Sequence, residues 1–315
     1  MSTDAQAWPS LPYTDWKDSC ATLQLWTQVV GKIRLAQTPW VNHSWHVPLY
    51  VTARGLTTSP IPYKSGAFQI DFDFVDHVLW LRTSEGHFRQ IVLNPMTVAA
   101  FYGAVFADLK ALGIDIAIDV IPNEIPDAIP FPDDTVHQSY DPHAAHAFWR
   151  ILLSSSLVFS HFRTSFLGKV SPVHFFWGSF DLAVTRFSGR RAPAHPGGVP
   201  NLPDAVVREA YSHEVSSAGF WPGGGGVVEE PAFYSYAYPA PDGFADAKVL
   251  PSEAYFHKTL GEFILPYDAV RKARDPAAAL LAFLQSTYDA AADLGKWDRQ
   301  MLECQLGEPR VPRPV

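Results

Sequence analysis

The segment Ala67–Leu93 reads AFQIDFDFVDHVLWLRTSEGHFRQIVL and decides the fold class. Its first eight residues alternate between apolar and polar side chains, which is typical of a strand with one buried face. Two further strand-like runs, 78–83 and 88–93, surround a Ser-Glu-Gly turn and predict a hairpin. Because these strands follow one another without an intervening helix, an antiparallel sheet is favoured over a parallel, doubly wound sheet.

Apolar residues at helical spacing flank this group of strands. They predict one helix from Asp15 to Ala36 and another from Thr97 to Leu112, which ends at Gly113. The second half repeats the order, with predicted helices at 142–167 and 276–294 and strands at 173–187, 211–220 and 232–238. The pattern predicts an α+β fold, with helices packed on one side of mainly antiparallel sheet. A partial barrel of two sheets is the alternative.

The repeated order raises the hypothesis of an internal duplication about a pseudo-twofold axis. An extended, strand-like run at 45–58 leads the strands of the first half, as the run from 173 leads those of the second. When these two lead strands are superposed, His46 falls on His174. Composition divides the chain in the same way. The predicted parts are a first α+β half at 1–121, a Pro- and Asp-rich connector at 122–141, a second half at 142–295 with most of the candidate site, and a C-terminal tail at 296–315.

Composition also limits the classes of function. Among 315 residues, 47% are hydrophobic and 14% aromatic, which allows a large core and an aromatic-lined pocket. The net charge of -8, with no basic run, argues against a nucleic-acid partner. We find no signal peptide and no apolar run long enough to cross a membrane. With only two cysteines, Cys20 and Cys304, a cytoplasmic protein without disulfides is expected.

Five motifs carry a resemblance to a known family. They are NHSWH (42–46), ARGLTTSPIPY (53–63), SPVHFFWGSFDLAVTRFSGRRAP (171–193), AYSHEVSSAGFWPGGG (210–225) and FYSYAYP (233–239). The chain resembles an uncharacterised bacterial family of soluble proteins of about this length, a domain of unknown function. The resemblance covers nearly the whole chain and implies one full-length functional unit. It implies no activity and no catalytic residue.

Four histidines are the candidate metal ligands. His43 and His46 form an H-x-x-H pair, His174 opens the equivalent strand of the second half, and His213 lies on a later strand. Imidazole ligands suit zinc or iron, so a divalent metal is the candidate cofactor if these strands converge. The chain has no HExxH and no CxxC spacing. Histidines bonded to backbone in loops are therefore the alternative.

Charged and aromatic residues complete the candidate site. Glu214 follows His213 and is a candidate general base, and Arg54 and Arg186 are candidate catalytic cations. The residues expected to bind a substrate are Trp177, Trp221, Tyr236, Tyr50 and Arg190. Arginine suits an anionic group on that substrate. Alternation along one continuous strand from His174 places His174 and Asp181 on opposite faces.

These features favour an enzyme whose aromatic pocket carries His, Glu and Arg groups. Its most concrete form is metal-assisted hydrolytic or redox chemistry on a small anionic or aromatic molecule. The first alternative is a non-catalytic protein that binds a small molecule through the same histidines. The second is a scaffold whose polar strand faces form an oligomer interface.

Overall fold

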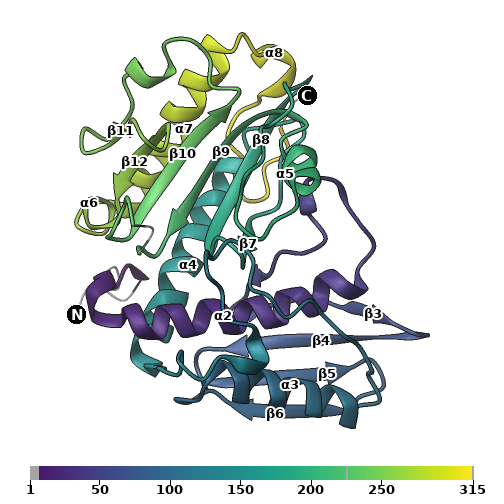
Figure 1. Cartoon of the computed structure of the whole chain (residues 1–315). Coiled ribbons are helices and arrows are strands. Elements are labelled where there is room, and N and C mark those ends of the chain that lie inside the picture. Colours follow the sequence, from purple (N-terminus) through teal and green to yellow (C-terminus); the bar gives the residue numbers. More distant parts are fainter. Residues whose placement is uncertain (1–6, 225, 314–315) are drawn as a thin grey trace.

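A computed structural model describes residues 7–224 and 226–313; the outermost residues of the predicted first half and tail lie outside this range. Two antiparallel six-stranded sheets form its framework (Figure 1). The first contains β1 (Tyr50–Val51), β2 (Gly55–Thr57), β3 (Ile61–Tyr63), β4 (Gly66–Asp73), β5 (Val78–Thr83) and β6 (Phe88–Val92). The second contains β7 (His174–Phe176), β8 (Asp181–Arg191), β9 (His213–Trp221), β10 (Ala232–Tyr238), β11 (Tyr255–His257) and β12 (Glu262–Pro266).

The two sheets are joined at their edges. The first has the order β1-β2-β4-β5-β6, with β3 also paired to β4, and the second has the order β11-β12-β10-β9-β8-β7. Leu49, just before β1, and Phe175 of β7 exchange both backbone hydrogen bonds at 2.9 Å. This bridge fixes the end of one sheet against the end of the other.

The helices confirm most of the sequence-based boundaries. The described helices are α2 (Tyr13–Gln37), α3 (Val98–Ala111), α4 (Pro142–Arg163), α5 (Asp204–Ala210), α6 (Tyr267–Arg271), α7 (Pro276–Leu294) and α8 (Arg299–Leu302). Asp141 caps α4, because its carboxylate accepts the backbone N–H of His143 at 2.8 Å. None of these helices has the length and apolar character needed to span a bilayer. The α+β class with antiparallel sheets is confirmed.

The internal duplication is not confirmed. The branch that β3 makes from β4 has no counterpart in the second sheet. His46 lies in a turn after the 3₁₀ segment η1 (Asn42–Ser44), whereas His174 opens β7. The division into two halves and a connector stays a prediction, although apolar residues from both halves pack in one continuous core.

Two predicted strands are interrupted by turns. The extended run expected at 45–58 is a 3₁₀ turn followed by the short hairpin of β1 and β2. The strand expected at 173–187 is two strands, because residues 177–180 form a turn in which Phe180 has a positive φ of 57°. This second correction matters for the site. His174 pairs with Ala183 and Phe176 with Asp181, so His174 and Asp181 share one face of the sheet.

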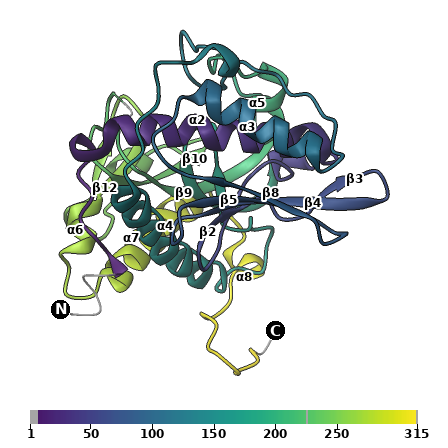
Figure 2. The same cartoon turned by 90° about the horizontal axis from the view of Figure 1, so that it is seen from below.

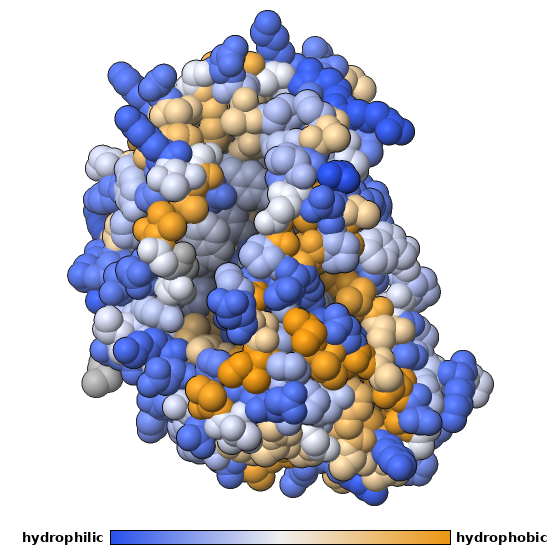
Figure 3. Space-filling model, viewed as in Figure 1, coloured by the Kyte–Doolittle hydropathy of each residue, from blue (hydrophilic) through white to orange (hydrophobic). Residues whose placement is uncertain are grey.

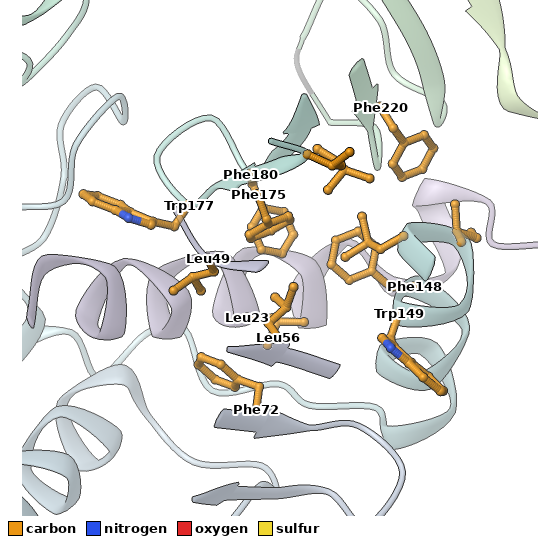
Figure 4. Packing of buried hydrophobic residues seen from close by; sticks show 14 of the residues in the cluster. Leu23, Leu49, Leu56, Phe72, Phe148, Trp149, Phe175, Trp177, Phe180 and Phe220 are labelled. Atoms are coloured by element: carbon orange, nitrogen blue, oxygen red, sulfur yellow. The ribbon is translucent and has the colours of Figure 1, made fainter. Parts of the chain in front are cut away.

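Helix α2 lies at the centre of the molecule. Figure 1 shows it crossing most of the molecule, with the first sheet on one side and the second on the other, and Figure 2 gives the view from below. Leu56 and Phe72 approach it from the first sheet, and Phe175 and Phe180 from the β7–β8 turn (Figure 4). Trp26 of α2 is fully buried. The helix therefore joins the cores of both sheets.

Gly31→Ala is expected to destabilise the protein by about 1–3 kcal/mol, because it overpacks this centre. A Cβ at Gly31 of α2 would lie 2.2 Å from Nε1 of Trp177, and that indole donates to the carbonyl of Val47 at 2.9 Å. Urea denaturation measures the effect. Gly103→Ala in α3 is the matched control, because an added Cβ there meets nothing within 4 Å. Equal stability of both variants would contradict the tight packing of α2 on Trp177.

Candidate functional site

A cavity of about 1010 Å³ lies on the face of the second sheet that is turned away from α4 and α7. Its floor comes from β7–β10 and β12, one wall from the end of α2 and from η1, and its cover from residues 117–124 and 199–211. The space-filling view shows a hollow over this part of the sheet (Figure 3). The cavity thus draws on both halves of the chain.

Strand alternation decides which side chains reach the cavity. Asp181 and Thr185 of β8, Ser217 and Trp221 of β9, and Tyr234 and Tyr236 of β10 all line it. Their neighbours along each strand point to the opposite face, toward the helices. Leu182, Arg186, Phe220 and Phe233 belong to that second set and are buried.

Asp181 is the most deeply placed acid of the cavity. Its side chain is only 5% exposed, and the hydroxyl of Tyr234 donates a hydrogen bond to its Oδ2. Burial, and to a smaller extent the charge of Glu124, raise the pKa of Asp181 to about 7, although the Tyr234 hydrogen bond acts in the opposite direction. This carboxyl therefore changes its charge near neutral pH.

Two further carboxyl groups face the same space. Burial, followed by the charge of Asp181, raises the pKa of Glu262 to about 8, and its Oε2 atom is buried without a hydrogen-bond partner in the described chain. Glu124 accepts a hydrogen bond from Ser179 Oγ at 2.6 Å, and burial raises its pKa as well. Ionisation of Glu124 thus raises the pKa of Asp181, and ionisation of Asp181 raises the pKa of Glu262.

A row of aromatic rings covers the floor beside these acids. Trp221 stacks on Tyr234 with ring centroids 4.4 Å apart, and Tyr234 is nearly parallel to Tyr236. Gly219 of β9 lies opposite Tyr234 of β10 and leaves room for its ring, because a Cβ at Gly219 would lie 2.3 Å from the Tyr234 hydroxyl. The glycine thus lets Tyr234 cross β9 and reach Asp181 on β8.

His174 stands at the opposite edge of the floor. It is 1% exposed, and neither ring nitrogen has a hydrogen-bond partner among the residues described. Its ring contacts include Trp45 at 5.8 Å and Phe176 at 5.4 Å between centroids. Burial lowers the pKa of His174 to about 3, so its imidazole is neutral under physiological conditions.

Five of the residues predicted from the sequence line the cavity: His43, His174, Trp177, Trp221 and Tyr236. His46 and His213 do not line it. The Nδ1 atom of His43 lies 2.9 Å from the Ala210 carbonyl, and that of His213 lies 3.0 Å from Ser212 Oγ. Across residues 7–224 and 226–313, no three His, Cys, Asp or Glu side chains are grouped to hold a metal ion. The four histidines are not assembled, and metal binding stays a prediction.

The predicted catalytic cations also lie away from the cavity. Arg186 points to the helix face of the sheet, because its neighbour Thr185 occupies the cavity face. Its guanidinium packs against the rings of Phe162 at 3.5 Å and Tyr288 at 4.3 Å. Arg54 lies on the hairpin of the first sheet, where it pairs with Asp73 at 2.6 Å.

The remaining three predicted residues are engaged outside the cavity. Glu214 accepts from Arg190 Nε at 2.8 Å and from Ser188 Oγ at 2.8 Å. Arg190 also donates to the carbonyl of Gly295 at 2.6 Å. Tyr50 packs beside His174 and Arg34. These contacts pair the side chains with other parts of the protein and do not present them to a ligand.

The sequence-based interpretation missed the acidic centre. Asp181 and Tyr234 lay in stretches recognised as strands, and the alternation of Tyr234 and Tyr236 was a usable signal. Glu124 lies in the connector, and Glu262 lies on β12, which was not predicted as a strand. No local motif marks either residue, because the sheet brings them together over long distances along the chain.

Comparison with known proteins gives one match. The model of a family of unknown function (DUF5996) matches residues 8–304. No curated protein and no solved structure matches the chain.

Proposed function

We propose that this chain, which belongs to the family of unknown function DUF5996, is an enzyme that performs acid–base chemistry on a small organic molecule. The substrate would lie against the aromatic floor, and Asp181 would transfer the proton. Tyr234 would position Asp181 through their hydrogen bond. A non-catalytic protein that binds a small molecule in the same cavity is the alternative.

The observation that carries this proposal is the Asp181–Tyr234 pair in the wall of a large cavity. General acid–base catalysis is most effective when the pKa of the catalytic group lies near the working pH. Burial raises the pKa of Asp181 to about 7, so both of its protonation states are populated near neutral pH. A carboxyl group with these properties in a cleft is a candidate for function on physical grounds.

The step we propose is a proton transfer. An ionised Asp181 oxygen takes a proton from a C–H, N–H or O–H bond of the substrate, and the bonding electron pair remains on the substrate atom. The Tyr234 hydroxyl donates to the other carboxylate oxygen and holds the group in place. Return of the proton to a different atom of the substrate completes an isomerisation. This differs from the metal-assisted reaction expected from the sequence, because the histidines are not assembled.

A conversion assay tests this proposal. Wild-type protein, Asp181→Asn and Tyr234→Phe would be incubated with a small-molecule extract of bacterial cells and followed by mass spectrometry. Wild type is expected to consume or form specific compounds. Asp181→Asn should lower that rate by about 10²–10⁴-fold, the usual contribution of a general acid or base. Tyr234→Phe should give an intermediate rate.

Two outcomes would contradict an enzyme that depends on Asp181. One is an Asp181→Asn variant as active as wild type. The other is binding of a compound without conversion by any variant, which supports the non-catalytic alternative.

We also propose that the protein works in a reducing compartment such as the cytoplasm. Its two free cysteines support this proposal.

A further inference from the structure

The cavity has more acidic than basic side chains in its lining. Its charged lining residues, in the part of the chain described, are Lys32, Asp119, Glu124, Asp181 and Glu262. Lys32 is already engaged, since its Nζ donates to the carbonyl of Ile121 at 2.6 Å and lies 3.6 Å from Asp119. No ion pair to Glu124, Asp181 or Glu262 occurs among the described side chains. A cation on a bound ligand would pair with these carboxyl groups and favour their ionised form.

Glu262 is the best placed of these acids to meet a cation. Its Oε2 atom is buried and has no hydrogen-bond partner within the described residues, whereas Asp181 is bonded to Tyr234 and Glu124 to Ser179. The faces of aromatic rings, such as those of Trp221 and Tyr236, also attract cations. Glu262 and these rings together suit a protonated amine, which has both a positive charge and N–H donors.

His174 supplies a second and independent point of contact. It lines the same cavity, it is 99% buried, and both of its ring nitrogens lack partners in the described structure. A neutral imidazole offers one donor and one acceptor, and leaving such groups buried and unpaired is unfavourable. A polar group on the ligand would satisfy one or both.

The sheet fixes the separation of these two points. His174 is on β7 and Glu262 on β12, and β8, β9 and β10 lie between them. Four strand spacings correspond to about 19 Å. The aromatic floor fills this interval. A ligand that touches both points is therefore long, with an apolar body between its polar ends.

We propose that the ligand of this cavity is an elongated organic amine. Its protonated nitrogen pairs with Glu262, its apolar body lies along Trp221 and the tyrosines, and a hydroxyl or carbonyl at its far end bonds His174. This inference rests on the proposed function in that it uses the same cavity, and it names the class of substrate. It leaves Asp181 available for proton transfer.

Three probes of one chain length test the charge preference: 12-aminododecan-1-ol, dodecane-1,12-diol and 12-hydroxydodecanoate. Affinities would be followed by quenching of tryptophan fluorescence, because Trp221 and Trp177 line the cavity. The amine is expected to bind at least about tenfold more tightly than the diol, in line with the strength of charged hydrogen bonds. The carboxylate should bind least.

Variants assign the two contacts. Glu262→Gln should weaken binding of the amino-alcohol by about tenfold or more and leave the diol unchanged. Glu214→Gln, at an acid outside the cavity, should change neither. His174→Phe should weaken binding of 12-aminododecan-1-ol. It should leave binding of dodecylamine unchanged, because dodecylamine lacks the far hydroxyl. Thermal unfolding of each variant would show that it is folded.

Two results would overturn the inference. The first is equal or tighter binding of the diol, which would indicate a neutral ligand. The second is amine binding that does not change in Glu262→Gln. Neither result bears on the conversion assay with Asp181→Asn. If the amine bound no more tightly than the diol while conversion still depended on Asp181, this inference alone would be refuted. Amine binding without conversion would refute the enzymatic proposal alone.

Discussion

Asp181→Asn is expected to make the protein more stable at pH 8 and to change its stability much less at pH 5. Burial raises the pKa of Asp181 from 3.8 to about 7 in the folded protein. Between these values the unfolded chain releases the proton and the folded chain keeps it, so the folded state loses stability as the pH rises. For this one group the loss between pH 5 and pH 8 is on the order of 2–3 kcal/mol.

Urea denaturation of both proteins at pH 5, 6, 7 and 8 measures this effect. The difference in the free energy of unfolding between variant and wild type should grow steadily with pH. Glu124, Glu262 and Tyr234 face Asp181. Adding Glu262→Gln should make the free energy of unfolding depend still less on pH, because the pKa of Glu262 is also raised in the folded protein. Asp242→Asn, at an exposed position, is the control for the chemical change. Parallel curves for wild type and Asp181→Asn would show that Asp181 is not buried in the uncharged form.

Arg186→Ala is expected to lower the free energy of unfolding by about 2–4 kcal/mol, through lost packing around a fully buried side chain. The guanidinium contacts Phe162, Phe166 and Tyr288, and its Nη2 donates to Ser165 Oγ at 2.8 Å. Its Nε and Nη1 have no partner in the described chain, and burial lowers the pKa of Arg186 to about 10. The buried charge itself therefore opposes folding.

A second substitution separates these two contributions. Arg186→Met keeps most of the volume and removes the charge, so it should be clearly more stable than Arg186→Ala. Arg208→Ala removes an ion pair with Asp204 that is exposed on both sides, so it should leave the denaturation midpoint nearly unchanged. Chemical denaturation reports all three. If Arg186→Ala kept wild-type stability but lost substrate conversion, the catalytic role expected from the sequence would be restored.

The sequence predicted the elements well and the faces of the strands less well. The strand at 66–73 and helices α2, α3, α4 and α7 were expected within a few residues, because each has a strong local periodicity. The face of Asp181 was predicted on the assumption of one continuous strand. The turn at residues 177–180 reverses the chain, and its left-handed residue is Phe180, which carries no local signal of that conformation.

The candidate site was predicted in part for a related physical reason. His174, Trp177, Trp221 and Tyr236 were found because they are aromatic or ionisable residues on or beside predicted strands. Glu124 and Glu262 reach Asp181 only through the tertiary fold. Arg186 was assigned to the site because a guanidinium suits an anionic group on a ligand. Its cage of aromatic rings comes from α4 and α7, far along the chain.

The central position of α2 has a consequence for the order of events during synthesis. The apolar surface of α2 is completed when residue 37 is made, but the Trp177–Gly178 turn that covers part of it comes much later in the chain. At the usual elongation rate, that interval lasts on the order of ten seconds. During it the nascent helix exposes apolar side chains without their final neighbours. We expect this protein to depend on ribosome-associated chaperones while it is being translated.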